Sequence, residues 1–408
     1  MTPASLGVSV DVTGSVEDLK KARPLLPVFS LFGKHDVPAR ISIDSVKLET
    51  AIPGFSAAFA KEPLGKRVAF DGAHFVVAEP QKGYRLDAVG LQQELAAALR
   101  RGDKTVDVPV TTTDAPPATI DLAAEQRRLE KLLATKVTFT YEGKNIVPTA
   151  KDIGGWFAPE NSTMVAAPER ISSYVRGAAA SLGSFANIDD AATATTYAMT
   201  KGQATTFRLV SDKVAVKHYY CVAQRGLDDS VLRELKLKLA ATLGDPRGWN
   251  ANGQVAFIYD EQNCEMHFWL SAASAMPSFG EICDPYYSCQ VYPNVVINYD
   301  RWTGATDPWN AQRLTLEDYR VMVINHEGGH WLGFGHSNCP GAGQPAPVMQ
   351  QQSVDLQGCV FNPWPTQTEL NTLVATGPLN RRYDSLVATA CCSCGHCTGA
   401  SSSAQHLI

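Results

Sequence analysis

Residues 323–336 read Val323-Ile324-Asn325-His326-Glu327-Gly328-Gly329-His330-Trp331-Leu332-Gly333-Phe334-Gly335-His336, which contains the pattern H-E-x-x-H-x-x-G-x-x-H. Two histidines four residues apart lie on one face of a helix, where neutral imidazoles can bind one zinc ion. We expect Gly333 to adopt a positive φ and end the helix, so that His336 returns as the third ligand. Three protein ligands leave a fourth position for water, which is typical of a catalytic zinc site.

Glu327 directly follows the first of these histidines, so its carboxylate can reach a zinc-bound water without being a ligand. We expect His326, His330 and His336 to bind Zn2+, and Glu327 to act as the general base in peptide hydrolysis. The alternative is an envelope-binding protein in which the same histidines bind zinc but the site no longer catalyses a reaction. Because a site that only binds metal does not need Glu327, the sequence favours the catalytic interpretation.

A second motif lies downstream, where Ala346-Pro347-Val348-Met349-Gln350-Gln351-Gln352 follows the third histidine after a short loop. Together the two motifs resemble the metzincin clan of zinc endopeptidases, whose second hallmark is a methionine turn beneath the metal. Ser337, directly after the third histidine, is similar to the matrixin branch. The resemblance implies that Met349 lies under the histidines, in a zincin domain with a mixed sheet and a zinc-binding active-site helix.

A wider region, about residues 205–375, resembles a family of bacterial secreted proteins whose metzincin-like domain is biochemically uncharacterised. Hydrophobic spacing in this region predicts helices at 228–243 and 316–332 and strands at 255–259, 266–270 and 294–299. A helix, then strands, then the zinc helix is the order expected of a metzincin N-terminal subdomain. The resemblance is carried by Asp245-Pro246-Arg247-Gly248-Trp249, Asn298-Tyr299-Asp300-Arg301-Trp302, Asn325-His326-Glu327 and Ala346-Pro347-Val348-Met349-Gln350-Gln351.

The first half of the chain reads as a small α+β unit. Residues 68–77 form a hairpin pattern around Asp71-Gly72, a helical pattern runs from Asp87 to Arg101, and residues 106–110 read as a strand. Over about residues 30–160 this order resembles the peptidoglycan-binding domain beside VanW-type proteins and some L,D-transpeptidases. The resemblance implies binding to peptidoglycan, and the alternative is a spacer that holds the zinc domain away from the membrane.

A composition shift divides the chain into a region at 1–185, a linker at 186–205, a domain at 206–385 and a cysteine-containing tail at 386–408. The resemblances imply that the first region is an α+β peptidoglycan-binding or spacer region and that the domain at 206–385 is metzincin-like. The expected fold class is therefore α+β. Residues 186–205 are rich in Ala, Thr and Asp, which is typical of a domain boundary. The tail contains Cys391-Cys392-Ser393-Cys394-Gly395-His396-Cys397. We expect this tail to be unstructured rather than a second zinc site, because no second cluster of four ligands accompanies it.

The 408 residues are 45% hydrophobic and carry a formal net charge of −5. This composition is sufficient for the cores of two or three domains. The absence of a long basic run argues against nucleic acid as a partner. No run of about 18 apolar residues occurs, so no membrane-spanning helix is predicted.

All ten cysteines lie at or after Cys221, and six of them fall inside the zinc domain. An even set suits disulfides formed in an oxidising compartment, whereas the alternative is a cytosolic protein with free thiols. Cys283 and Cys289 enclose a short loop with a proline, and a bond between Cys339 and Cys359 would close the glycine-rich loop that contains Met349. The expected pairs are Cys283 with Cys289, Cys339 with Cys359 and, by elimination, Cys221 with Cys264.

Residues 1–21 lack the basic-then-apolar layout of a signal peptide. Because the cysteines indicate export, we expect the signal or membrane anchor to lie outside this sequence. The sequence thus predicts an extracellular or cell-envelope zinc metallopeptidase that acts on a protein or peptide substrate and binds peptidoglycan. The alternatives are a catalytically silent cell-wall-binding protein and a peptidase that cleaves peptidoglycan stem peptides.

Overall fold

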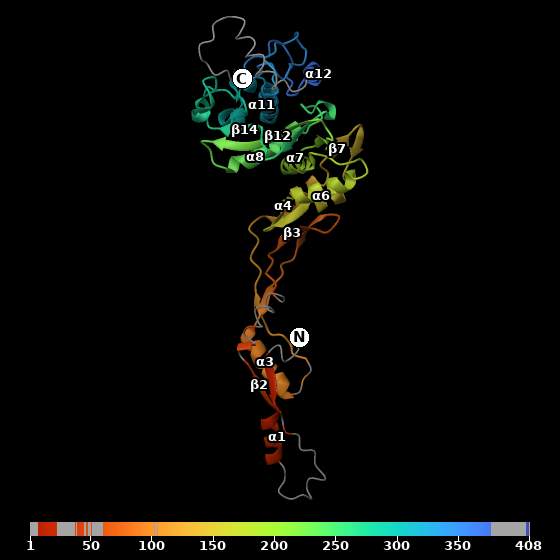
Figure 1. Cartoon of the computed structure of the whole chain (residues 1–408), viewed down its shortest axis with the longest axis vertical. Coiled ribbons are helices and arrows are strands. Elements are labelled where there is room, and N and C mark those ends of the chain that lie inside the picture. Colours follow the sequence, from red (N-terminus) through yellow and green to blue (C-terminus); the bar gives the residue numbers. More distant parts are fainter. Residues whose placement is uncertain are drawn as a thin grey trace. The chain divides into compact units, whose positions relative to one another are not determined.

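The computed structural model describes residues 7–22, 37, 39–44, 46, 47, 50, 60–101, 103, 105–376 and 405–407 (Figure 1). The chain divides into two compact units that alternate along the sequence. The first contains residues 1–69, 76–126 and 159–163, and the second contains residues 70–75, 127–158 and 164–408. Helices occur beside several small sheets, so the fold class is α+β, as predicted.

The first unit is built mainly from two-stranded sheets. β1 pairs antiparallel with β2, β5 pairs antiparallel with β6, and β3 and β4 form the predicted hairpin. The strand predicted at residues 106–110 begins only at Val110, because Val110 to Thr113 are the residues that pair with β5. The elements are β1 (Val8–Asp11), α1 (Val12–Lys21), β2 (Arg40–Ile43), β3 (Arg67–Phe70), β4 (Phe75–Ala78), β5 (Gly83–Leu86), α3 (Ala88–Arg101) and β6 (Val110–Thr113).

A three-stranded sheet ties residues from both halves of the sequence into the second unit. β7 (Val137–Tyr141) pairs antiparallel with β8 (Lys144–Ile146) and parallel with β11 (Thr205–Arg208). This long-range pairing explains why the units do not divide after residue 185, where the sequence suggested a boundary. The neighbouring elements along the chain are α4 (Leu122–Leu132), α5 (Ala150–Gly155), β9 (Phe157–Glu160), β10 (Thr163–Ala166) and α6 (Pro168–Ala179).

The linker expected at residues 186–205 is instead a buried helix, α7 (Ile188–Lys201). Ala191, Ala194 and Ala198 are buried, and α7 packs against α6 and against α8 (Ser230–Leu243). Small Ala and Thr side chains allow helices to approach closely. The segment whose composition resembles that of a linker is therefore a helix, α7, that packs between two other helices.

A six-stranded mixed sheet lies at the centre of the second unit, in the order β13-β12-β14-β16-β15-β17. Four neighbouring strands are parallel, while β15 runs antiparallel to β16 and β17 runs antiparallel to β15. The strands are β12 (Val216–Arg225), β13 (Val255–Tyr259), β14 (Met266–Ser271), β15 (Cys289–Val291), β16 (Asn294–Asn298) and β17 (Gln405–Leu407). The mixed sheet and three predicted strands are thus observed, whereas β15 was not predicted.

The expected unstructured tail at residues 386–408 is described only at Gln405–Leu407, which form β17. The rest of that tail, including the cysteines of residues 391–397, lies outside the described residues. The three-residue strand differs from the expectation because its backbone pairs with the edge strand β15.

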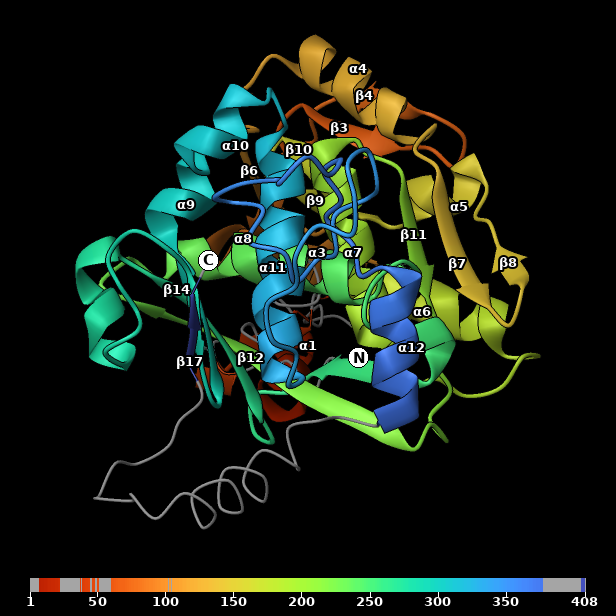
Figure 2. The ribbon, with the colours of Figure 1, turned by 90° about the horizontal axis from the view of Figure 1, so that it is seen from above.

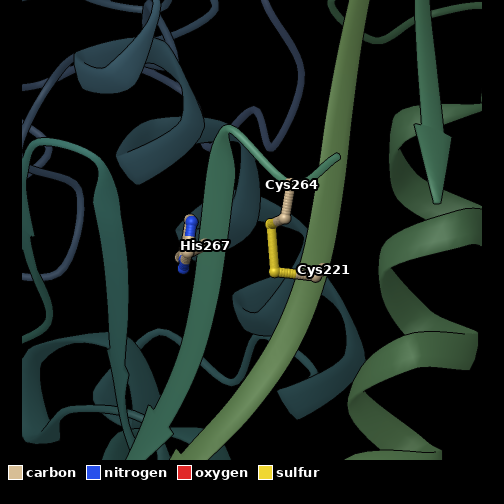
Figure 3. Close-up of side chains that lie close together, drawn as sticks. All are labelled: Cys221, Cys264 and His267. Atoms are coloured by element: carbon tan, nitrogen blue, oxygen red, sulfur yellow. A yellow bond between two sulfur atoms is a disulfide. The ribbon is translucent and has the colours of Figure 1, made fainter. Parts of the chain in front are cut away.

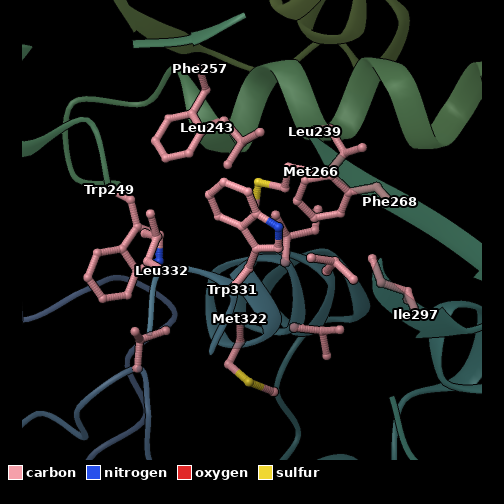
Figure 4. Packing of buried hydrophobic residues seen from close by; sticks show 14 of the residues in the cluster. Leu239, Leu243, Trp249, Phe257, Met266, Phe268, Ile297, Met322, Trp331 and Leu332 are labelled. Carbon is pink, nitrogen blue, oxygen red and sulfur yellow. The ribbon is translucent and has the colours of Figure 1, made fainter. Parts of the chain in front are cut away.

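Helix α11 (Leu316–Trp331) contacts β15, β16 and α8, so the sheet and α8 hold it in place (Figures 1 and 2). Figure 4 shows Trp331 on the side of α11 that faces Leu239 and Leu243 of α8 and Met266 of β14, whereas Met322 extends from the opposite side of α11. All five side chains belong to one buried hydrophobic cluster. Burying each such side chain stabilises the folded state by roughly 1.5–3 kcal/mol. Helix α11 is therefore part of the hydrophobic core. The remaining elements are η3 (Ala251–Gly253), η4 (Ala273–Phe279), α9 (Tyr299–Gly304), α10 (Asp307–Ala311) and α12 (Gln367–Thr376).

Candidate metal centre

Helix α11 begins and ends as the sequence predicts. The Thr315 side chain accepts a hydrogen bond from the backbone N–H of Asp318 at 3.1 Å, which caps the first turn. Gly333 follows the last turn with a φ of 97°, a conformation that favours glycine. The chain can therefore turn back immediately after the helix and bring His336 towards it.

The structure brings the three predicted ligands together. The ligand atoms of His326, His330 and His336 all lie within 4.8 Å of one another. The Nε2 atom of His330 lies 3.0 Å from that of His326 and 3.2 Å from that of His336. His326 and His330 are buried whereas His336 is exposed, so the cluster meets solvent on the side of His336.

Backbone carbonyls fix the tautomers of the two buried rings. His326 Nδ1 lies 2.8 Å from the Val348 carbonyl oxygen, and His330 Nδ1 lies 2.7 Å from that of Phe334. A carbonyl oxygen only accepts, so each Nδ1 must carry the proton. In a neutral imidazole the Nε2 lone pair then points into the cluster, which is the arrangement that a metal-binding histidine requires.

Glu327 is fully buried beside this cluster. In the part of the chain that the structure describes, neither of its carboxylate oxygens has a hydrogen-bond partner. Burial raises the pKa of Glu327 well above its usual value. An isolated buried carboxylate is costly, and a cation with bound water nearby relieves this cost. The histidine donor set and the unsatisfied carboxylate therefore both fit a zinc ion.

Met349, which we expected to form a methionine turn, is buried, and its sulfur lies close to Gly329 of α11. A Cβ atom on Gly329 would overlap the Met349 sulfur and would lie 3.0 Å from Cζ2 of Trp249. The backbone of Met349 also accepts a hydrogen bond from the N–H of Ser337 at 3.0 Å. A glycine inside the H-E-x-x-H motif thus allows the methionine side chain to approach the helix closely.

All three expected disulfides are present: Cys221–Cys264, Cys283–Cys289 and Cys339–Cys359. The last closes the loop between His336 and the segment after Met349. His267 lies close to the Cys221–Cys264 bond (Figure 3). Because thiolate is the form of cysteine that binds metal, sulfurs joined in a disulfide make this second group unsuitable as a metal site.

Two further contributions to the site were not predicted from the sequence. Trp249 donates its indole N–H to the Asn325 carbonyl oxygen at 2.9 Å, next to the predicted ligand His326. The buried carboxylate of Glu369 accepts the backbone N–H groups of Val348 at 3.2 Å and Met349 at 3.0 Å. The pattern Thr366-x-x-Glu369 does signal a capping box, but it gives no sign of the contact with Met349.

Models of two protein families match parts of the chain. Residues 193–362 match a family described as "Protein of unknown function (DUF3152)", and residues 2–107 match one described as "Putative peptidoglycan binding domain". No curated protein and no solved structure matches the chain. The second match supports a peptidoglycan-binding region at the N-terminus, and neither description names a peptidase.

Across the described residues, no helix has both the length and the apolar character needed to cross a membrane.

Proposed function

We propose that this protein is a cell-envelope peptidase that depends on zinc and binds peptidoglycan through its N-terminal region. The observation that carries the catalytic part is the convergence of three imidazoles beside a buried glutamate without a partner. The mixed sheet and the methionine under α11 agree with what the resemblance to metzincins implies. The three disulfides support an oxidising compartment.

His326, His330 and His336 would hold the metal through their Nε2 atoms. Zinc held there would supply a Lewis acid that lets water act as a nucleophile near pH 7. The Val348 and Phe334 carbonyl oxygens keep the two buried rings in the required tautomer and orientation. Because His336 is the exposed member of the cluster, a substrate would approach the metal from the side of His336.

Glu327 would move the proton. Its carboxylate oxygens would take a proton from the attacking water and deliver it to the nitrogen of the leaving amine. Glu327 is buried, and none of the described residues donates a hydrogen bond to its carboxylate. The carboxylate would therefore accept the proton without first losing a hydrogen bond. A general base in this position typically accelerates a reaction by about 10²–10⁴-fold.

The N-terminal match supports the part of the proposal that concerns the cell wall. A chain that binds peptidoglycan holds its second unit near wall polymers and near exported proteins. Stem peptides of peptidoglycan are therefore a substrate class to test beside proteins.

A second candidate function is a cell-wall-binding envelope protein without turnover. The match of residues 2–107 favours it directly, whereas neither matched family is described as a peptidase. The buried Glu327 argues for the peptidase, because a site that only binds metal gains nothing from a buried carboxylate without a partner.

Incubation of the zinc-loaded full chain with a labelled protein panel and with synthetic stem peptides tests the proposal. We expect cleavage that a chelator abolishes and that falls by about 10²–10⁴-fold in Glu327→Gln, while that variant keeps its zinc. His336→Ala serves as the control that loses the metal itself. Zinc binding without cleavage of any panel member would favour the second candidate, and cleavage by Glu327→Gln at the wild-type rate would exclude the assigned role.

A further inference from the structure

Glu369 is a buried carboxylate on α12 whose contacts reach beyond its own helix. The residue is 6% exposed. Oε2 accepts the Thr366 N–H at 2.7 Å and the Thr366 hydroxyl at 2.8 Å, which caps α12. Oε2 also accepts the Val348 N–H at 3.2 Å, and Oε1 accepts the Met349 N–H at 3.0 Å.

One peptide group connects this carboxylate to the candidate metal centre. The N–H of the Val348–Met349 peptide donates to Glu369 Oε1, and the carbonyl oxygen of the same peptide accepts the Nδ1–H of His326 at 2.8 Å. Val348, Met349 and His326 are buried, so water does not screen either bond. The peptide thus lies between a negative charge on one side and an imidazole on the other.

Hydrogen bonds in such a chain polarise one another, and they do so more strongly in a buried environment. A carboxylate at the N–H end makes the carbonyl oxygen a stronger acceptor. That oxygen then holds the His326 ring more firmly and increases the basicity of its Nε2 atom. Carboxylates that bond directly to metal-binding histidines act in the same way.

We propose that Glu369 is a positioning residue for the metal centre, which raises the zinc affinity of His326 through the Val348–Met349 peptide. The inference rests on the zinc-binding part of the proposed function and does not depend on catalysis. It assigns a role to a residue outside both the zinc motif and the methionine turn.

Two substitutions separate this role from helix capping. In Glu369→Gln, three donors meet at the Oε2 position and one at Oε1, so the amide is expected to place its oxygen at Oε2 and its NH2 group against the Met349 N–H. The cap then remains while the contact with Met349 is lost. Thr366→Ala does the reverse, because it removes the capping hydroxyl and leaves the contact with Met349.

Zinc affinity of the full chain, measured by competition with a chromophoric chelator, is the first readout. We expect Glu369→Gln to bind zinc about 10–100-fold more weakly, the usual effect of losing a partner that orients a ligand. Thr366→Ala is expected to bind zinc like the wild type even though its midpoint of thermal unfolding falls. Equal zinc affinity of Glu369→Gln and the wild type would overturn the proposal, as would an equal loss in Thr366→Ala.

The His326 ring resonances of the zinc-free chain are the second readout. The wild type must show a protonated Nδ1 that exchanges slowly with solvent, and its resonance should move in Glu369→Gln but not in Thr366→Ala. An Nδ1 without that proton in the wild type contradicts the proposal even if Glu369→Gln does not fold. A wild-type chain that binds no zinc but shows these ring signals would instead refute the proposed function and leave the hydrogen-bonded connection intact.

Discussion

Gly329, a single residue inside the H-E-x-x-H motif, controls how closely Met349 approaches α11. Any side chain at this position would overlap the Met349 sulfur and crowd Trp249, which also donates a hydrogen bond to the helix. The neighbouring Gly328 is different, because a Cβ atom there would meet only Met266 Cε at 3.5 Å. Two adjacent glycines on one helix therefore offer a matched pair.

We predict that Gly329→Ala destabilises the protein by about 1–3 kcal/mol, the usual cost of overpacking a core, and weakens zinc binding. Gly328→Ala should be neutral or stabilising by up to about 1 kcal/mol, because alanine favours the helix. Urea midpoints and zinc competition on both variants provide the measurement. Equal behaviour of the two variants would contradict the close contact between Gly329 and Met349.

At the residue scale, the sequence predicted the residues whose spacing is local. His326, His330 and Gly333 lie within one helix and the turn after it, and the geometry of such a segment follows from helical periodicity. Glu369 could not be predicted, because its contact with the Met349 backbone joins two segments 20 residues apart without any pattern between them. Every residue other than proline has the same backbone N–H group, so the sequence does not indicate which of these groups a side chain will bind.

At the scale of elements, α7 shows how a buried polar group can anchor a helix to a sheet. Asp190 is buried and accepts hydrogen bonds from the Tyr220 hydroxyl at 2.6 Å and from the Tyr259 N–H at 3.2 Å. Burial raises the pKa of Asp190 to about 6, while these hydrogen bonds and the charge of Lys236 oppose the rise. The folded protein thus holds this proton more tightly than the unfolded chain.

The sign of the pH dependence follows from this difference. A carboxyl group with a pKa of about 6 in the folded state and 3.8 in the unfolded state favours folding most below pH 3.8, and this contribution is lost as the pH rises through 6. The full change is on the order of 3 kcal/mol. Asp190→Asn keeps an acceptor for the Tyr259 N–H and cannot ionise.

We therefore predict that the free energy of unfolding falls less between pH 4 and pH 8 in Asp190→Asn than in the wild type. Urea titrations of both proteins across this range measure the difference. The same slope in both proteins would show that Asp190 does not titrate in this interval.

The sequence predicted elements with a clear hydrophobic period and missed those without one. Helices α8 and α11 and strands β13, β14 and β16 occur within a few residues of their expected positions. Helix α7 was missed because its Ala and Thr residues form no alternating or helical stripe of large apolar side chains. Strand β15 has three residues, which is too short for a periodic signal, and its pairing with β16 places it in the sheet.

At the scale of the whole molecule, the sequence indicated two functional regions but not how the chain divides between them. Residues 70–75 and 127–158 belong to the second compact unit although they precede the predicted boundary. The parallel pairing of β7 with β11 joins residues more than 60 positions apart. Local patterns cannot predict such a pairing, because the sequence pattern of each strand does not depend on which strand it pairs with.

We predict that the full chain sediments with purified insoluble peptidoglycan at low and moderate salt, as expected from the match of residues 2–107. A chain of residues 127–408 lacks that region and should stay in the supernatant. Circular dichroism and zinc content verify that this shorter chain is folded. If the full chain also stays in the supernatant, the N-terminal region is a spacer.

The zinc content of the purified full chain is the measurement that tests the central claim most directly. We predict about one zinc per chain in the wild type and in Glu327→Gln, and almost none in His330→Ala, because the metal needs the Nε2 atoms of all three histidines. Elemental analysis after incubation with zinc and removal of the excess gives the answer. A wild-type chain that holds no zinc, or a His330→Ala chain that holds as much as the wild type, would contradict the account.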